Sequence, residues 1–507
     1  MAEAVARTTG ARLLSGTLWN AAGRGLPLLL ALALTPLLVH QMGIDRWGLF
    51  TLALALVGVF GVFDLGVGAA LTRAIATRLG SGDMADATEL AGAALAALLG
   101  LSVLIGGVAF AAVPALVAGL LNTPPDLQQE AILAFRLLCL AAPLVVVNAA
   151  LWGVLAAHQR FREANLATIP VAIFYYAGPA LVLLVWQSLV GVILALLACR
   201  LANSISYLRL ARRDMPGLGL AWPRGALVAP LLRMGGWMSA SGVLTQALLY
   251  ADRFLVGAVL TLSAVAFYAT PLDLVMRMWI LPVAVAQALL PAMAASYLSA
   301  AAATVALLRR GALMVMALVL PACLILVVAG PWLLGLWLGA EFAEGGGQVL
   351  QILALGIFFS CAAFAPGALL DAIGRPEANA LWQLAQAALF LPLSFLLLLR
   401  FGIEGAALAW AARCATDAAG RLLLCAHFYP SAREAARAML LPLAAAGAGL
   451  GAALLLPPAL GAAAALVGLG LFLAAAARGL SPEERRDARI LLRRPQRLRA
   501  VLKGEPA

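Results

Sequence analysis

Long apolar runs alternate with short polar breaks along the whole chain. The runs approach or exceed the length of about 20 residues that a helix needs to cross the hydrocarbon core of a bilayer. Membrane barrels consist instead of shorter segments of alternating polarity, so these continuous runs predict helices. We expect fourteen spans, at about 15–40, 47–72, 88–118, 127–156, 161–186, 188–210, 229–258, 263–293, 308–339, 346–370, 378–399, 403–426, 437–457 and 459–478.

Basic residues gather on one side of these spans. With the N-terminus placed inside, 24 of the 34 Arg and Lys residues fall inside, 2 fall outside and 8 lie within spans. One missed helix would invert every later loop, so this asymmetry supports the span pattern. Both termini are therefore expected in the cytoplasm. The first run contains Asn20 and Arg24 and has no convincing cleavage site, so we expect the mature chain to keep it as a helix.

The span pattern divides into two halves. Helices one to six and helices seven to twelve have nearly equal length, and both sets begin inside, which indicates a parallel repeat. The prediction is an all-α polytopic membrane protein with two six-helix bundles, related by a pseudo-twofold repeat, and two extra C-terminal helices. Its expected parts are an N-terminal lobe at 1–212, a C-terminal lobe at 227–428, helices thirteen and fourteen at 437–479 and a basic cytoplasmic tail at 480–507.

Composition excludes several function classes. The chain is 64% hydrophobic and 11% charged, with a mean hydropathy of +1.01, whereas a soluble domain is about half apolar and a quarter charged. No extramembrane stretch is long enough for a folded domain of about 50 residues, and the sequence carries no catalytic motif. We therefore expect no enzyme. The 6 Cys and 3 His lack metal-ligand spacing, so no metal or bound cofactor is expected.

The formal net charge of +11 fits a membrane surface. Part of it lies in the basic tail, which we expect to rest on anionic lipid headgroups. The tail lacks an aromatic pattern for binding bases, so nucleic acid is not an expected partner.

Arginines inside the spans are the main candidates for function. Each costs about 2.5–3.5 kcal/mol at a helix centre, so a chain that keeps several usually offers them an anion, an acidic partner or water. Arg24, Arg253 and Arg277 fall on helices one, seven and eight, which occupy corresponding places in the two halves. Together they would form a cationic cavity suited to phosphate, because guanidinium matches phosphate oxygens in bidentate fashion.

Acidic residues also lie within the spans. Asp64, Asp252 and Asp273 are candidates for coupling transport to Na⁺ or H⁺, and the alternative is that each neutralises a nearby Arg. On helix twelve, Arg413, Asp417 and Arg421 are spaced one turn apart, which favours a structural charge ladder.

Short motifs in helices one, two and seven carry a family resemblance. They are Ser15–Asn20, Pro36–Leu38, Met42-Gly43, Trp47–Phe50, Phe63–Gly68 followed by Arg73, and Tyr250–Phe254 followed by Val256-Gly257. These motifs resemble the bacterial polysaccharide flippases of the multidrug/oligosaccharidyl-lipid/polysaccharide (MOP) superfamily, which are related to lipid II flippases and MATE exporters.

The resemblance implies a central cavity lined by helices one, two, seven and eight. It implies transport of an undecaprenyl-diphosphate-linked oligosaccharide from the inner to the outer leaflet of the bacterial inner membrane by alternating access. In the related lipid II flippases, cavity arginines hold the diphosphate, and helices thirteen and fourteen form a groove for the lipid tail. The two extra helices of this chain fit either subgroup. The implied partners are this substrate, membrane lipids and glycan polymerase or assembly proteins.

Two other functions stay open at this point. A cation-coupled drug or metabolite exporter of the MATE type would need acidic residues to dominate the cavity, whereas arginines balance or exceed them here. A membrane glycan polymerase or ligase would need a large outer loop, and no predicted outer loop is large. For the flippase, an ion gradient or the membrane potential is the expected energy source, because the chain has no nucleotide-binding motif.

Overall fold

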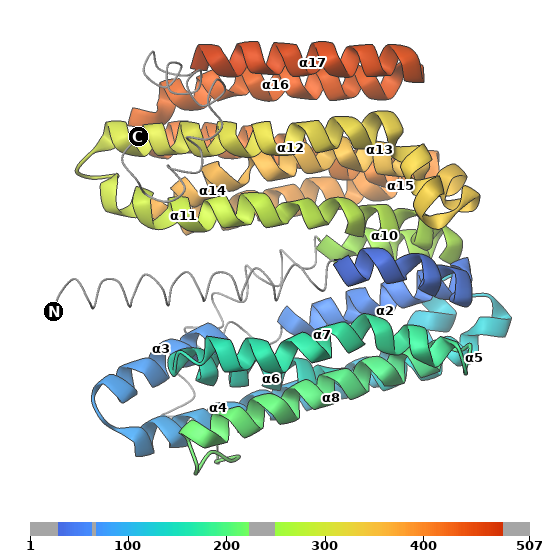
Figure 1. Ribbon diagram of the computed structural model, residues 1–507, viewed down its shortest axis with the longest axis vertical. Coiled ribbons are helices and arrows are strands. Elements are labelled where there is room, and N and C mark those ends of the chain that lie inside the picture. Colours follow the sequence, from blue (N-terminus) through green and yellow to red (C-terminus); the bar gives the residue numbers. More distant parts are fainter. Residues whose placement is uncertain (1–28, 63–66, 223–248, 480–507) are drawn as a thin grey trace. The chain divides into compact units, whose positions relative to one another are not determined.

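The computed structural model describes residues 29–62, 67–222 and 249–479, and within these ranges every regular element is a helix (Figure 1). A short helix at Leu29–Met42 comes first. The others are α2 Ile44–Val62, α3 Val67–Gly80, α4 Met84–Ala115, α5 Pro125–Cys139, α6 Ala141–Ala157, α7 Phe161–Leu183, α8 Leu189–Asp214, α10 Leu262–Met276, α11 Ile280–Ser296, α12 Ala301–Leu338, α13 Ala340–Ala362, α14 Phe364–Ala372, α15 Pro376–Phe428, α16 Arg433–Leu455 and α17 Pro458–Gly479, with single turns at Leu116–Leu120, Arg277–Trp279 and Pro430–Ala432.

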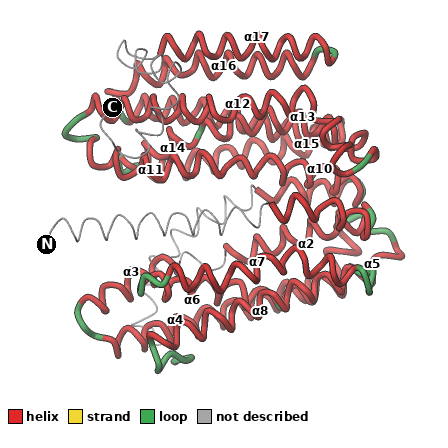
Figure 2. The backbone as a smooth tube through the Cα atoms, in the orientation of Figure 1, coloured by secondary structure: helices red, strands yellow, loops and turns green. Residues whose placement is uncertain are grey.

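The predicted membrane fold is confirmed. Within the described ranges, 11 helical segments are long and apolar enough to cross a bilayer, and short loops join them (Figure 2). Several predicted spans consist of two helices in line: α5 and α6 form the fourth, α10 and α11 the eighth, and α13 and α14 the tenth. Helix starts follow local signals, since Asp83 and Ser188 cap α4 and α8 with side-chain oxygens and Pro125 begins α5.

The predicted spans eleven and twelve form a tight hairpin inside α15. Gly402 has φ 62° and ψ −145°, a backbone conformation that strongly favours glycine. On either side the chain pairs with itself: the Trp382 indole donates to Asp417, and the Gln386 amide donates to the Arg413 carbonyl. The helical segment therefore reverses direction at Gly402, as two spans require.

The chain forms two compact units, Met1–Thr270 and Pro271–Ala507. This division falls within α10. Residues 249–270 pack in the first unit. The Asn122 side chain donates to the carbonyls of Ala258 and Leu260, at 3.2 and 2.8 Å, and the Trp47 indole donates to the Thr270 hydroxyl at 2.8 Å.

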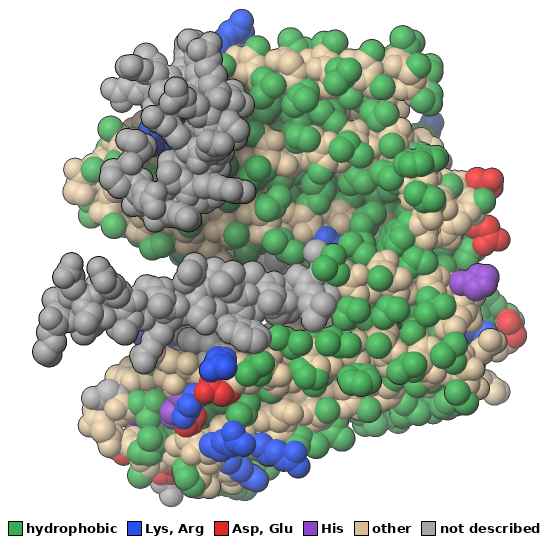
Figure 3. All heavy atoms as spheres, in the orientation of Figure 1, with side chains coloured by type: hydrophobic (Ala, Val, Ile, Leu, Met, Phe, Trp, Pro, Cys, Tyr) green, Lys and Arg blue, Asp and Glu red, His purple; other side chains and the backbone are tan. Residues whose placement is uncertain are grey.

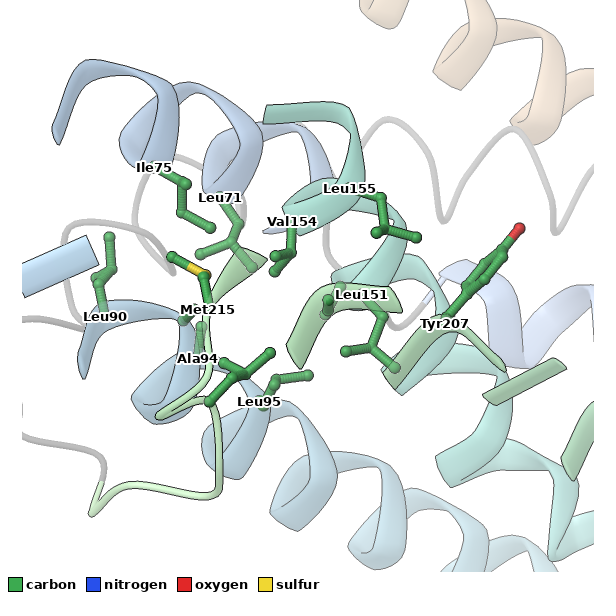
Figure 4. Packing of buried hydrophobic residues seen from close by; sticks show 14 of the residues in the cluster. Leu71, Ile75, Leu90, Ala94, Leu95, Leu151, Val154, Leu155, Tyr207 and Met215 are labelled. Atoms are coloured by element: carbon green, nitrogen blue, oxygen red, sulfur yellow. The ribbon is translucent and has the colours of Figure 1, made fainter. Parts of the chain in front are cut away.

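A hydrophobic core joins α3, α4, α6 and α8 in the first unit (Figure 4). Leu71, Leu90, Leu151 and Val154 are each at most 1% exposed. Met215, which follows α8, completes the cluster and is also fully buried. The core thus fixes the ends of these four helices against one another.

In the second unit, α12 packs along α13, and α13 packs along α15. The C-terminal pair is close-packed at Gly449 of α16 and Gly468 of α17, where a Cβ atom on either would collide with the backbone of the other. Helix α16 also packs against α12, α13 and α15. The two added helices therefore belong to the second compact unit.

The helix surfaces carry large apolar side chains. Figure 3 shows hydrophobic side chains spread over the visible face, with charged side chains gathered mainly near helix ends. Leu336 of α12 and Leu466 of α17 are 74% and 72% exposed. Such surfaces match lipid rather than water, so the protein is a multi-pass membrane protein.

Candidate functional site

The predicted site residues fall in different parts of the structure. Arg24 and Asp64 lie outside the described residues. Asp252 and Arg253 belong to the first compact unit, and Asp273 and Arg277 to the second. The geometry of each pair is described within its own unit.

Asp252 and Arg253 are both buried, at 7% and 3% exposure. The Tyr268 hydroxyl of α10 donates to Asp252 Oδ2 at 3.3 Å. The Arg253 guanidinium carbon lies 5.4 Å from the centre of the Tyr250 ring, within cation–π range. The two neighbouring charges therefore each have an aromatic partner of their own.

Glycines of α2 make this arrangement possible. The Tyr250 ring lies against Gly58, where a Cβ atom would overlap the ring, and the Leu262 carbonyl lies against Gly48 in the same way. Residues 249–270 can approach α2 closely only because these two positions lack side chains. Gly48 belongs to a motif that the sequence analysis had singled out, and its role here is close packing.

Arg277 lies at a break in a predicted span. It is exposed and begins the 3₁₀ turn Arg277–Trp279 between α10 and α11. Pro282 explains the break, because a proline within a helix has no N–H for the carbonyl four residues earlier and clashes with it. Mid-helix 3₁₀ turns often mark functional hinges.

Trp279 fixes this turn to the rest of the second unit. Its indole donates to the Ser360 hydroxyl of α13 at 3.0 Å, and its ring meets Phe364 of α14 edge-on at 5.9 Å. Asp273 is half-buried one turn before Arg277, within α10. In the part of the chain that the structure describes, no ion pair joins Arg277 to Asp273.

One rung of the predicted charge ladder is present in α15. Arg421 Nε lies 2.9 Å from Asp417 Oδ1, and each side chain is 14% exposed. Asp417 Oδ1 also accepts from the Trp382 indole at 3.1 Å. Arg413 is half-buried on the same helix, and its carbonyl accepts from Gln386. The Asp417–Arg421 pair thus joins the two arms of the α15 hairpin.

A further intramembrane arginine was not assigned a role from the sequence. Arg200 of α8 stacks over Tyr175 of α7, with its guanidinium carbon 5.6 Å from the ring centre and Nη2 3.5 Å from the hydroxyl. Its place in the middle of an apolar run was the signal that could have identified it. No cluster of three His, Cys, Asp or Glu side chains suited to a metal occurs among the described residues.

Sequence comparison identifies the family. Residues 13–297, more than half of the chain, match the family described as polysaccharide biosynthesis protein. The chain belongs to this family. A Shigella flexneri protein described as "Putative O-antigen transporter" is 24% identical over 406 residues, which cover 80% of this chain and 96% of that protein.

Solved structures show the same fold. The lipid II flippase MurJ in an inward closed conformation has a TM-score of 0.70 at 11% identity, covering 91% of this chain and 98% of MurJ. An inward-facing multidrug resistance MATE transporter of the MOP superfamily has a TM-score of 0.67 at 16% identity, covering 83% of this chain and 96% of that one. Both solved structures share the fold of this chain, and the predicted resemblance to polysaccharide transport proteins agrees with the family match.

Proposed function

We propose that this member of the polysaccharide biosynthesis family is a flippase for undecaprenyl-diphosphate-linked oligosaccharide or polysaccharide repeat units. It moves them from the inner to the outer leaflet by alternating access and catalyses no chemical reaction. The family match over residues 13–297 carries the proposal, and the O-antigen transporter relative, similar over almost its whole length, supports it.

The arginines in the spans supply the site for the diphosphate. We assign this role to Arg24, Arg253 and Arg277. Support comes from Arg277, which is exposed at a helix break within an apolar span and forms no ion pair in the described part of the chain. Guanidinium donors suit a diphosphate, because they can bind two oxygens at once.

Asp64, Asp252 and Asp273 are the proposed sites for Na⁺ or H⁺. Asp252 is buried next to Arg253, so a change in its protonation would alter the local charge balance. Asn variants separate coupling from binding in proteoliposomes that carry an ion gradient. Loss of gradient-driven flipping with retained substrate binding in one variant identifies the coupling residue. Unchanged gradient dependence in all three would leave the membrane potential acting on the diphosphate.

The proposed location is the bacterial inner membrane with both termini in the cytoplasm. Reporter fusions after Asp214, Arg375 and Glu434 should report cytoplasm, and fusions after Pro124, Glu344 and Pro458 should report periplasm. A periplasmic signal after Asp214 would contradict the parallel repeat, because both halves must begin inside. Membrane lipids are expected partners, and glycan polymerase or assembly proteins would receive the product.

A flipping assay tests the function itself. Purified protein in liposomes should move undecaprenyl-diphosphate-N-acetylglucosamine to the opposite leaflet, as detected by enzymatic modification of the sugar from one side only. Protein-free liposomes and liposomes with an unrelated membrane protein are the controls. Drug efflux without lipid flipping would instead favour the cation-coupled exporter of the MATE type, and linking of glycan units would favour a polymerase or ligase.

A further inference from the structure

Three helices of the first unit meet around Tyr207 of α8. Its ring lies 6.0 Å from the Trp152 ring of α6, and its hydroxyl is 2.6 Å from Thr168 Oγ1 of α7. Tyr207 is only 6% exposed. These contacts identify the faces of α6, α7 and α8 that point toward a common seam.

The same faces turn polar toward the middle of the spans. Residues four or seven apart lie on one face of a helix. Asn203 and Arg200 precede Tyr207 by four and seven residues on α8, and Asn148 precedes Trp152 by four on α6. On α7, Tyr175 follows Thr168 by seven.

All of these polar residues lie on the same side of Tyr207 along the helix axes, because α7 runs antiparallel to α6 and α8. The bond from Arg160 to Asp214 joins the start of α7 to the end of α8. Since α6 ends only a few residues before Arg160, the ends of α6 and α8 lie together. Four residues of helix rise about 6 Å and seven about 10 Å. Asn148 and Asn203 therefore lie about 6 Å, and Arg200 and Tyr175 about 10 Å, from the level of Tyr207 along their helices, on the faces that meet there. We call these four residues the polar layer.

The polar layer contains unsatisfied hydrogen-bonding groups. Asn148 Oδ1 and Asn203 Oδ1 are buried, and neither has a hydrogen-bond partner within the part of the chain that is described. Arg200 uses one of its donors on Tyr175, and no carboxylate pairs with it among the described residues. Unpaired polar atoms in a membrane span are costly, so they are typically kept for a ligand or water.

Snorkelling does not explain Arg200. It lies near the midpoint of α8, which runs from Leu189 to Asp214, so both ends of the helix are about 15 Å or more away. It also shares the helix face of buried Leu196 and Tyr207, whereas Leu194, Leu201 and Ile205 form the exposed face. Arg200 therefore faces the interior of the unit rather than lipid.

We propose that the polar layer binds the sugar portion of the transported lipid-linked glycan. The two amide oxygens accept hydrogen bonds from sugar hydroxyl groups, and Arg200 donates to hydroxyl or carboxylate oxygens of the sugar. The Tyr175 and Tyr176 rings, which meet edge-on at 5.4 Å, provide an apolar wall for the C–H face of a sugar ring. This inference rests on the proposed flippase function and adds a glycan subsite separate from the diphosphate arginines.

Leucine variants of the two asparagines test the subsite. Asn148→Leu and Asn203→Leu replace an unpaired buried amide by an apolar group of similar size, which should leave the melting temperature equal or higher. Their affinity for undecaprenyl-diphosphate-N-acetylglucosamine should fall about tenfold, a change of about 1.4 kcal/mol. Their affinity for sugar-free undecaprenyl diphosphate should stay within about twofold of wild type.

Arg200→Gln is the second test of the subsite, and Arg136→Gln is its matched control. Arg136 is also an intramembrane arginine of the first unit, and it stacks on Phe110 at 5.0 Å. Arg200→Gln should weaken binding of the sugar-carrying lipid alone, and Arg136→Gln should weaken neither lipid.

Each outcome decides the inference. Equal weakening of both lipids in the Asn and Arg200 variants would assign the layer to the diphosphate and overturn the glycan subsite. Unchanged binding of the sugar-carrying lipid would also overturn it, leaving the layer as a hydrated structural feature. If the wild-type protein binds neither lipid, the proposed flippase function itself fails, which separates the two conclusions.

Discussion

Arg253 and Arg277 belong to consecutive predicted spans, and the structure gives them opposite environments. Arg253 is 3% exposed, stacks on Tyr250 and lies beside Asp252. Arg277 is exposed at a 3₁₀ turn where α10 ends and α11 begins. The contrast teaches that arginines of neighbouring apolar spans can differ fully in burial, and that the exposed one lies at a break in its helix.

The two environments also predict different effects when each arginine is replaced. Arg253 is buried and stacks on Tyr250, so replacing it should lower the thermal stability of the protein. Arg277 is exposed and forms no ion pair among the described residues, so its loss should lower transport while leaving the fold intact. Four substitutions test this difference.

Arg277→Ala should have the largest effect. Two hydrogen bonds to a charged phosphate contribute about 1.5–3 kcal/mol each, so substrate affinity should fall by at least about two orders of magnitude and glycan export should stop. Arg277→Lys should restore export only in part, because a point charge lacks the bidentate geometry. Surface glycan is measured at matched protein levels, with exposed Arg400→Ala as the control. Normal export by Arg277→Ala would contradict the assigned role.

Arg253→Ala should lower stability as well as substrate affinity, because Arg253 is packed against Tyr250 in addition to its proposed diphosphate role. The desolvated stacking on Tyr250 is worth about 2 kcal/mol, so the thermal midpoint in detergent should fall. Arg277→Ala in the same assay should melt like the wild type. An Arg253→Ala protein that melts like the wild type would show that Arg253 is not a packing residue, and the contrast with Arg277 would then disappear.

Pro282→Ala tests whether the helix break presents Arg277. An alanine restores the missing backbone donor, so α10 and α11 can join as one regular helix. We expect a partial loss of export, an unchanged or higher melting temperature and weaker reaction of Arg277→Cys with a charged thiol reagent in the Pro282→Ala background. Pro291→Ala, farther along α11, serves as the control. Full export and full labelling in the Pro282→Ala background would show that Pro282 does not cause the break between α10 and α11.

Tyr268→Phe should have the smallest effect. It removes the donor to Asp252 Oδ2, and at 3.3 Å this bond should contribute about 1 kcal/mol. A modest drop in the thermal midpoint with normal export is expected. If Tyr268→Phe also changes the ion dependence of flipping, Asp252 is a coupling site rather than a charge that only neutralises Arg253.

The sequence predicts the membrane fold well because length and apolarity alone determine a span. It does not predict where a span breaks inside. Pro282 is visible in the sequence, but α12 continues through Pro321 and Pro331, so a proline alone does not identify a break. The residues that determine the environment of each charge are distant in the sequence and meet only in the fold, as Gly58 does with Tyr250 and Trp279 with Ser360.

Charged residues spaced one helical turn apart do not always form an ion pair in the structure. The one-turn spacing gave the Asp417–Arg421 pair correctly, because both residues lie within one regular helix. Asp273 and Arg277 have the same spacing, but α10 ends between them and Arg277 begins a 3₁₀ turn. The sequence alone does not reveal the polar layer around Arg200, because its members come from three helices. The Tyr207 contacts show that the faces of these helices converge.

The single-residue reversal at Gly402 has a consequence for how the protein is made. Almost no loop joins the two arms of α15, so we expect them to enter the membrane as a helical hairpin in which Trp382 meets Asp417. A side chain at Gly402 would then interfere with biogenesis at the translocon, before the protein has any glycan to carry.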